Sequence, residues 1–371
     1  MKDEMDNVPP VRVRSEDAVA SIHRRRVLQG VGALAASALL NPLARAQAGR
    51  FDGKQLVYVS WGGVYQDFQK KSYCDPFAKE TGARIIQDGP VNEAKIRSMV
   101  AAGGNPDWNV IDVTDTFLFN GTAHNLFEKL DFSIVNKSMV EPAYVTDYGI
   151  GTCAWSYNVA YNTKAFGVGK GPKTWADLFD VKRFPGKRMF RNRVYATLEI
   201  ALLADGVEPS KLYPLDVNRA LKKLDTIKDH ITWWTTPSQS QQLIVDGAVS
   251  CGVIQNGRAY DASRKGAPIA IEWAQNLQSV DYLVILKGTK NLDVAMHLVN
   301  RSIQPDAQAM FSNNTAYSPV NPAAFSRIDK AISPWLATQK DNVAKGVILN
   351  AAWWQDKLEA LDASWNAWRL S

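Results

Sequence analysis

Two oppositely charged residues, Arg258 and Asp281, stand beside apolar runs where they could hold a ligand. Arg258 follows the run 251–254, and Asp281 precedes the run 283–286. Open α/β sheets bind ligands in the crevice at the carboxyl ends of their strands. We therefore expect the two charges to hold opposite ends of a small polar ligand. The alternative is that both are ordinary surface or helix-cap charges, because most charged residues are simply solvated.

The stretch 251–286 predicts the elements that would position these charges. It favours a buried strand, a tight turn at Asn256-Gly257 and the start of a helix. Two further strands would follow, the second of them at 281–286. The stretch would also carry the chain back across a hinge.

The first 46 residues resemble an export leader. Residues 23–29, HRRRVLQ, resemble the twin-arginine signature, and an apolar run follows at 30–40. Small-x-small cleavage patterns occur at 44–46 and 46–48. The apolar run is too short to span a bilayer, so we expect cleavage, export by the twin-arginine machinery and a periplasmic mature chain. The alternative is a membrane anchor or an amphipathic surface helix.

Length and charge limit the classes of protein to consider. A chain of 371 residues usually divides into two domains. The formal net charge of +6 is spread along the chain without a basic run in the mature part, which argues against nucleic-acid binding. The three cysteines, Cys74, Cys153 and Cys251, are odd in number and far apart, so we expect buried free thiols.

Strand and helix patterns alternate in the first part of the mature chain. Short apolar strands are predicted at 55–60, 84–87 and 109–113, with helical patterns between them. This alternation is typical of an α/β fold with a parallel sheet. The polar and aromatic residues that follow these strands are predicted ligand contacts: Trp61, Tyr65, Thr114 and Thr116.

Three segments of the second part matter for the site and the core. The Gly/Lys/Pro-rich residues 167–173 predict a passage between domains. Residues 187–193 predict a strand with a basic end, where Arg191 and Arg193 share one face. The alternative is that this face is an outward edge of the strand. Five apolar residues near the end predict one helix with a core-packing face: Trp354, Leu358, Leu361, Trp365 and Trp368.

Catalytic and metal-binding patterns are absent from the sequence. The four histidines are scattered and form no spaced metal set. No nucleophile elbow, Walker loop or Gly-x-Gly-x-x-Gly turn after a strand occurs. We therefore expect a binding protein rather than an enzyme, with no cofactor and no metal.

Six short motifs occur in a fixed order, at 59–65, 161–166, 174–178, 184–186, 253–258 and 281–285. This ordered set resembles the solute-binding proteins of ABC importers, closest to the spermidine/putrescine-binding group. The resemblance implies the two-lobed periplasmic-binding-protein fold, type II-like, with hinge-crossing strands and a ligand cleft that closes. It also implies a small-molecule solute and an inner-membrane ABC permease as partners, and a monomer.

The expected lobes follow from where the chain crosses the hinge. Lobe 1 would comprise residues 50–157 and 283–325, and lobe 2 residues 158–280 and 326–371.

The resemblance also implies roles for site residues. Trp61 and Tyr65 match first-lobe aromatics, Thr114 and Thr116 match hydroxyl contacts, and Asp281 matches a carboxylate that binds an ammonium group.

The sequence departs from the polyamine pattern at two places. Residues 191–196 hold no carboxylate where second-lobe acidic residues are expected, and Gln255 replaces an expected aromatic residue. Arg258 or Arg193 could instead grip a carboxylate through paired N–H groups, while Asp281 or a ring takes an ammonium. We therefore expect an ω-amino acid such as 4-aminobutyrate. Putrescine or spermidine, an exported enzyme and a ligand-state sensor subunit remain alternatives.

Overall fold

The computed structural model describes residues 49–371. The predicted leader, its twin-arginine motif and its cleavage sites therefore lie outside the described residues. None of the helices from residue 49 onward has both the length and the apolar character that crossing a bilayer requires.

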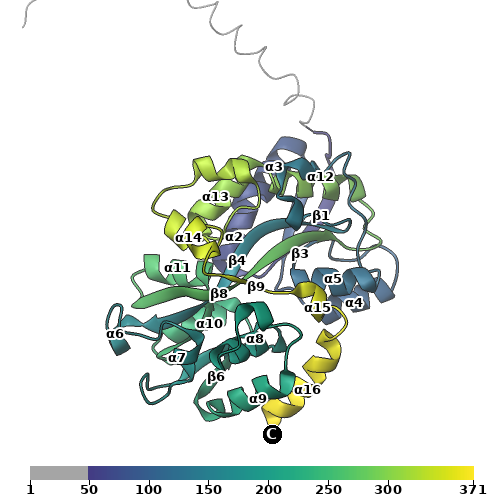
Figure 1. The fold of residues 1–371 in the computed structure, drawn as a ribbon. Coiled ribbons are helices and arrows are strands. Elements are labelled where there is room, and N and C mark those ends of the chain that lie inside the picture. Colours follow the sequence, from purple (N-terminus) through teal and green to yellow (C-terminus); the bar gives the residue numbers. More distant parts are fainter. Residues whose placement is uncertain (1–48) are drawn as a thin grey trace, which may run out of the picture. The chain divides into compact units, whose positions relative to one another are not determined.

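The described residues build one mixed nine-stranded sheet with helices packed around it (Figure 1). The strands run in the order β2-β1-β3-β8-β4-β7-β5-β6, and β9 pairs with β8. The strand bounds are β1 Gln55–Val59, β2 Arg84–Asp88, β3 Val110–Thr114, β4 Gly149–Asn162, β5 Arg188–Arg191, β6 Ile231–Trp234, β7 Cys251–Gln255, β8 Ile269–Ile285 and β9 Val347–Ile348.

Parallel strands form both ends of the sheet. β1 pairs in parallel with β2 and β3, and β5 pairs in parallel with β6 and β7. The antiparallel pair β4 and β8 joins these two ends. The predicted α/β class with a parallel sheet and crossing strands is confirmed.

Helices connect most of the strands. Their bounds are α2 Gly63–Gln69, α3 Asp75–Thr81, α4 Glu93–Ala101, α5 Asp115–Ala123, α6 Thr163–Phe166, α7 Trp175–Phe179, α8 Val194–Ala204, α9 Val217–Asp225, α10 Pro237–Val245, α11 Asn256–Arg264, α12 Leu292–Ser302, α13 Pro305–Thr315, α14 Lys340–Val343, α15 Ala351–Trp354 and α16 Leu358–Leu370.

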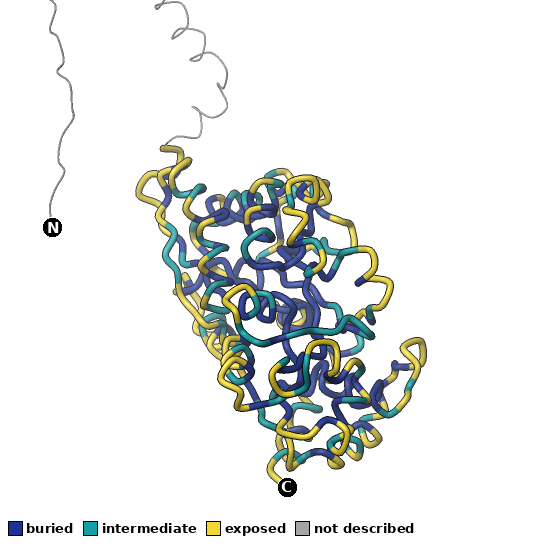
Figure 2. The backbone as a smooth tube through the Cα atoms, turned by 90° about the vertical axis from the view of Figure 1, so that its left-hand side faces the viewer, coloured by how far each residue is buried: buried dark blue, intermediate teal, exposed yellow. Residues whose placement is uncertain are grey.

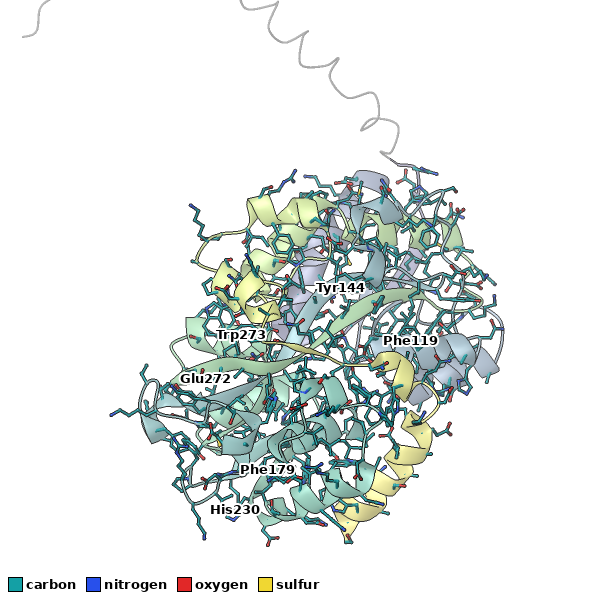
Figure 3. All side chains as sticks on the ribbon, in the orientation of Figure 1. Phe119, Tyr144, Phe179, His230, Glu272 and Trp273 are labelled. Carbon is teal, nitrogen blue, oxygen red and sulfur yellow. The ribbon has the colours of Figure 1, made fainter. Side chains whose placement is uncertain are left out.

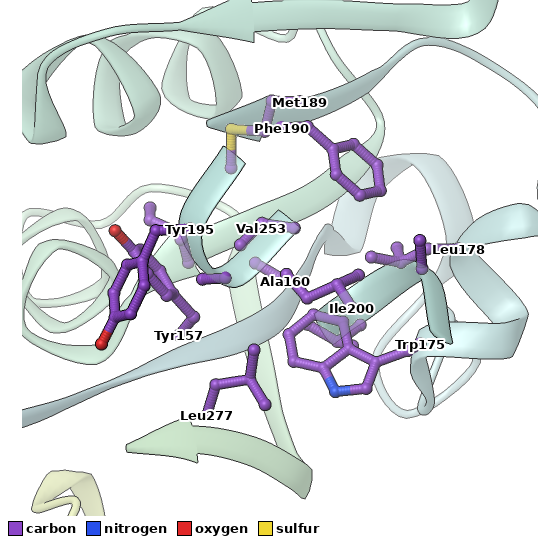
Figure 4. Close-up of a cluster of buried hydrophobic side chains, with 14 of the residues drawn as sticks. Tyr157, Ala160, Trp175, Leu178, Met189, Phe190, Tyr195, Ile200, Val253 and Leu277 are labelled. Carbon is purple, nitrogen blue, oxygen red and sulfur yellow. The ribbon is translucent and has the colours of Figure 1, made fainter. Parts of the chain in front are cut away.

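Two large groups of buried apolar side chains lie on either side of the β4–β8 pair. One group is built mainly on β1, β3 and the C-terminal end of β8, with α12 packed against it. The other is built on β5, β7 and α8, and Figure 4 shows its central residues, among them Trp175, Phe190 and Val253. In Figure 2 the buried segments of residues 49–371 run through the interior of the backbone trace, and the exposed segments lie at its periphery. The residue boundaries of the two lobes stay a prediction.

Two predictions about local structure are wrong. Asn256-Gly257 forms no tight turn: α11 begins at Asn256 directly after β7. The asparagine side chain instead bonds to the backbone, accepting from Ser156 N and donating to the carbonyls of Ala316 and Trp335. Residues 269–285 are one continuous strand rather than two, because β4 pairs along nearly its whole length.

The predicted C-terminal helix is also interrupted. α15 ends at Trp354 and α16 begins at Leu358, so the five apolar residues lie on two helices. Their predicted role in the core is confirmed for Trp354, Leu358 and Trp365, which are buried in the same apolar group as α8.

Candidate functional site

A small cavity lies where the two parallel ends of the sheet meet the connecting strands. Its lining residues are Trp61, Tyr65, Thr114, Arg191, Pro237, Gln255, Arg258, Asp281 and Tyr317. About 300 Å³ of space there is free of protein atoms, part of it open to solvent, but only about 10 Å³ admits the centre of a water molecule. The surrounding side chains have therefore closed upon one another.

Arg258 and Arg191 bring two buried guanidinium groups to this cavity. Arg258 lies in the first turn of α11, and its Nη2 is 3.4 Å from the carbonyl oxygen of Gly62. Its Nε is buried and has no hydrogen-bond partner in residues 49–371. Arg191 ends β5 and donates to the hydroxyl of Tyr157.

These contacts leave both charges poorly compensated. Arg258 is 4% exposed and Arg191 8% exposed. Neither forms an ion pair with a carboxylate in the described part of the chain. A buried charge without a counter-charge is costly, and a guanidinium matches the geometry of a carboxylate. The two groups form a site ready for an anionic group.

Asp281 supplies a carboxylate to the same cavity. It lies in β8 opposite Thr114 of β3, so the sheet register sets its position. Its Oδ1 accepts from the indole N–H of Trp155 at 2.8 Å, and its Oδ2 accepts from the Tyr65 hydroxyl at 3.2 Å. The same hydroxyl lies 2.9 Å from Oδ2 of Asp112.

The carboxyls of Asp112 and Asp281 are therefore both within hydrogen-bond distance of the Tyr65 hydroxyl, which has a single hydrogen to donate. Burial raises the pKa of Asp281 well above its usual value, and the nearby charge of Asp112 raises it further. Burial likewise raises the pKa of Asp112. A ligand cation beside Asp281 would favour its ionised form and reverse this shift.

Aromatic rings form the remaining walls. The rings of Tyr65 and Tyr317 meet edge to face with centroids 4.8 Å apart. Tyr317 can lie there because residue 257 is glycine: a Cβ at Gly257 would come within 2.1 Å of the Tyr317 ring. Trp61 follows β1 and completes the ring-lined side of the cavity. Such faces suit an ammonium group or an aliphatic segment.

The structure brings together most of the predicted site residues. Trp61, Tyr65, Thr114, Gln255, Arg258 and Asp281 line the cavity.

Thr116 and Arg193 lie outside that lining. Arg193 Nη2 is 3.2 Å from Glu93 Oε1 and 3.4 Å from Thr116 Oγ1, and Thr116 Oγ1 is 3.0 Å from Thr114 Oγ1. Arg193 thus connects the start of α8 with α4 and α5 rather than facing the cavity.

Sequence reasoning missed three lining residues. Arg191 was weighed only as a strand-edge residue, although its strand was expected. Pro237 lies in the first turn of α10. Tyr317 belongs to a loop more than thirty residues beyond β8 and carries no local pattern that points to a ligand.

The described residues contain no group of His, Cys, Asp or Glu side chains arranged to hold a metal ion. The three cysteines are free and buried, as expected. Burial raises the pKa of each thiol, to about 11 for Cys251. Such thiols are poor nucleophiles.

A two-lobed α/β fold whose connecting strands run beside a charged, ring-lined cleft is the architecture of a solute-binding protein. Residues 72–342 match the model of the bacterial extracellular solute-binding protein family, and the chain belongs to this family. It is therefore a periplasmic solute-binding protein and not an enzyme.

Characterised relatives extend over most of the chain. It is 33% identical over 333 residues to a gamma-aminobutyric acid-binding protein of Pseudomonas aeruginosa, covering 88% of this chain and 94% of the relative. It is 21% identical over 336 residues to the spermidine/putrescine-binding periplasmic protein of Escherichia coli, covering 88% and 93%.

Solved structures match the fold closely. A structure described as a GABA receptor has a TM-score of 0.78 and 40% identity, covering 85% of this chain and 98% of that chain. A binding protein of A. tumefaciens in complex with agropinic acid has a TM-score of 0.81 and 33% identity, covering 86% and 99%.

Proposed function

We propose that this protein captures a short ω-amino acid of the 4-aminobutyrate type in the cleft and delivers it to an ABC permease. The observation that carries the proposal is the pair of buried guanidinium groups, Arg191 and Arg258, which line a cavity with a single carboxylate, Asp281, among its described residues. A zwitterion complements this set of charges.

The charges assign an orientation to the solute. The solute carboxylate would accept paired N–H bonds from Arg258, with Arg191 adding a second positive charge. Its ammonium group would lie beside Asp281 and the ring of Tyr65. The aliphatic chain between the two ends would contact the rings of Trp61 and Tyr317.

Relatives support the same class of solute. One relative, at 33% identity, is described as a gamma-aminobutyric acid-binding protein. One solved structure, at 40% identity, is described as a GABA receptor. A diamine such as putrescine remains the second candidate, because a spermidine/putrescine-binding relative also spans most of the chain. Two uncompensated guanidinium groups would repel a dication, which favours the amino acid.

The proposal also covers the export route of the protein and its oligomeric state. The twin-arginine motif at residues 23–29 supports export of the folded chain across the inner membrane. We infer that the mature protein acts as a monomer, with lobe 1 comprising residues 50–157 and 283–325 and lobe 2 residues 158–280 and 326–371.

Calorimetric titration of ligand-stripped protein with 4-aminobutyrate and with putrescine tests the proposal. Loss of a charged hydrogen-bond pair costs about 1.5–3 kcal/mol, so Arg258→Ala should weaken 4-aminobutyrate binding roughly 10- to 100-fold. The exposed residue Arg327 offers a matched control, because Arg327→Ala removes the same group from the surface.

Two results would contradict the assignment. One is putrescine binding that tightens in Arg258→Ala while 4-aminobutyrate gives no heat in the wild type. The other is 4-aminobutyrate binding that survives both Arg258→Ala and Asp281→Asn.

A further inference from the structure

We propose that a groove beside the connecting strands is a second small-molecule site, which takes an organic cation with an apolar body. The groove has a volume of about 580 Å³, far more than the closed cleft. Volumes of several hundred cubic ångströms are typical of small-molecule sites.

The groove lies at the edge of β8 between its pairing with β3 and its pairing with β9, where Val280 and Tyr282 point away from Asp281 and Ser279 shares its face. Asp281 of β8 lines the cleft, whereas its neighbours Val280 and Tyr282 line the groove. Successive side chains of a strand point to opposite faces. Ala154 of β4, paired with Val280, lies on the groove side.

The groove walls come from both sides of the hinge. Phe119 of α5 and Tyr144, both labelled in Figure 3, belong to the N-terminal part of the chain. Tyr213 and the segment 348–352, which includes the start of α15, form the opposite wall. Any rotation about β4 and β8 therefore changes the width of the groove.

The chemistry of the walls favours a cation. Five aromatic residues contribute to them: Phe119, Tyr144, Trp155, Tyr213 and Tyr282. Asp115 is the single charged residue among the described lining residues, and the described lining holds no lysine or arginine. Aromatic faces attract cations. Arg193 lies outside the lining but near Asp115, where its charge lowers the pKa of this carboxyl against the larger effect of burial.

Asp115 retains capacity for one more donor. Its carboxylate accepts from the backbone N–H of Thr116 at 2.7 Å, from the Tyr195 hydroxyl at 3.0 and 3.1 Å, and from the Ser279 hydroxyl at 3.0 Å. These are three hydrogens, whereas a carboxylate offers about four acceptor sites. An ammonium group could occupy the remaining one.

The groove is linked to the cleft through the strands and through Trp155. The indole of Trp155 donates to Asp281 in the cleft, and the same residue lines the groove. Because the groove walls come from both sides of the hinge, rotation that closes the cleft also changes the groove. A cation that fills the groove therefore changes the affinity of the cleft for its solute, and by linkage the solute changes the affinity of the groove for the cation by the same factor.

Calorimetry with 2-phenylethylamine tests the site directly on the ligand-free mature protein. We expect one saturable site, with at least tenfold weaker binding of the uncharged analogue 2-phenylethanol and of the anion 3-phenylpropionate. Saturating 4-aminobutyrate should change the Kd of 2-phenylethylamine about two- to fivefold without preventing its binding.

Variants distinguish the groove from the cleft. Ala352→Trp at the exposed groove rim should weaken 2-phenylethylamine at least tenfold, whereas Ala360→Trp on the exposed face of α16 should not. Asp115→Asn should weaken it similarly, and Asp281→Asn should leave it within threefold. The Trp variants keep the test valid if Asp115→Asn fails to fold.

Absence of saturable heat with 2-phenylethylamine would overturn the second site. So would competition with 4-aminobutyrate, or binding that is lost in Asp281→Asn but kept in Ala352→Trp, because each would place the cation in the cleft. The coupling between 4-aminobutyrate and 2-phenylethylamine rests on the proposed function, whereas the titration with 2-phenylethylamine alone does not. If 4-aminobutyrate fails to bind while 2-phenylethylamine binds and Ala352→Trp abolishes it, only the cleft assignment falls.

Discussion

Arg193 Nη2 lies 3.2 Å from Glu93 Oε1, and this ion pair joins the two ends of the sheet across the β4–β8 connection. Arg193 begins α8 next to β5, whereas Glu93 begins α4 next to β2. Burial by itself would lower the pKa of Arg193, but attraction to Glu93 and Asp362 raises it above the usual value. The ion pair therefore stabilises the conformation in which these two ends of the sheet meet.

Removal of this ion pair should weaken solute binding without removing a solute contact. The pair is partly exposed and contributes about 1 kcal/mol, so Arg193→Met should raise the Kd for 4-aminobutyrate roughly fivefold, mainly through faster release. Stopped-flow fluorescence checks this.

Glu93→Gln should give a similar change, and the double variant should not add to it. If Arg193→Met abolishes binding while Glu93→Gln has no effect, Arg193 contacts the solute directly.

Solute binding should release a proton from Asp281. Burial and the charge of Asp112 raise the pKa of Asp281, and an ammonium group beside it would lower that pKa again. Affinity should therefore rise with pH above the usual carboxyl range, by up to tenfold per pH unit for one proton. Titrations in buffers of different ionisation enthalpy measure the released proton. An identical heat in every buffer would contradict this prediction, and Asp281→Asn should remove the effect.

Gly257→Ala should disturb the cleft through Tyr317. The new methyl group would lie 2.1 Å from the ring, so the ring must move. Overpacking of this kind costs about 1–3 kcal/mol, and solute binding should weaken because Tyr317 lines the cavity. Thermal unfolding and calorimetry measure the two effects.

A second substitution separates the effect on stability from the effect on solute affinity. Gly257→Ala combined with Tyr317→Leu should recover most of the stability but not the affinity. An unchanged affinity in Gly257→Ala would show that the ring position is unimportant for the solute.

Glu199 should make the protein less stable as the pH rises. Its Oε1 accepts from Trp354 Nε1 at 2.6 Å and from the Tyr213 hydroxyl at 2.8 Å, and burial raises its pKa to about 7. A carboxyl with a raised pKa binds protons more tightly in the folded state, so stability is lost as the pH rises from about 4.5 to about 7. This group accounts for roughly 2–3 kcal/mol of that loss.

Denaturant unfolding of Glu199→Gln across this pH range checks the expectation. The variant mimics the protonated side chain and should show a shallower loss of stability. A slope equal to that of the wild type would rule out a raised pKa for Glu199.

The fold followed from the sequence where patterns were local. Strand–helix alternation between residues 55 and 113 predicted the parallel sheet, because each connection is short. The continuous strand β8 was missed because residues 270–275 are only partly buried and lack a strong alternation, and β4 supplies the pairing from more than a hundred residues away. Asn256 also has a distant partner, the carbonyl of Ala316, and residues 256–257 begin a helix rather than form a turn.

Residues of the candidate site were likewise predictable from the sequence only where a local pattern contains them. Arg258 and Asp281 were identifiable because each stands at the end of a recognisable strand, and the structure brings them to one cavity. Arg193 and Arg191 have the same residue type and share a strand face in the sequence pattern. Chain direction changes at the end of β5, so Arg191 faces the cavity and Arg193 turns to Glu93. Sequence periodicity does not encode such a change.

The three buried thiols have a consequence for where this protein can mature. Cys74, Cys153 and Cys251 form no cross-link with one another, and burial holds each in its unreactive protonated form. The native state thus needs neither an oxidant to assemble nor a reductant to persist. Chains folded in a reducing compartment and chains folded in an oxidising one should reach the same structure, whichever side of the membrane the folding takes place on.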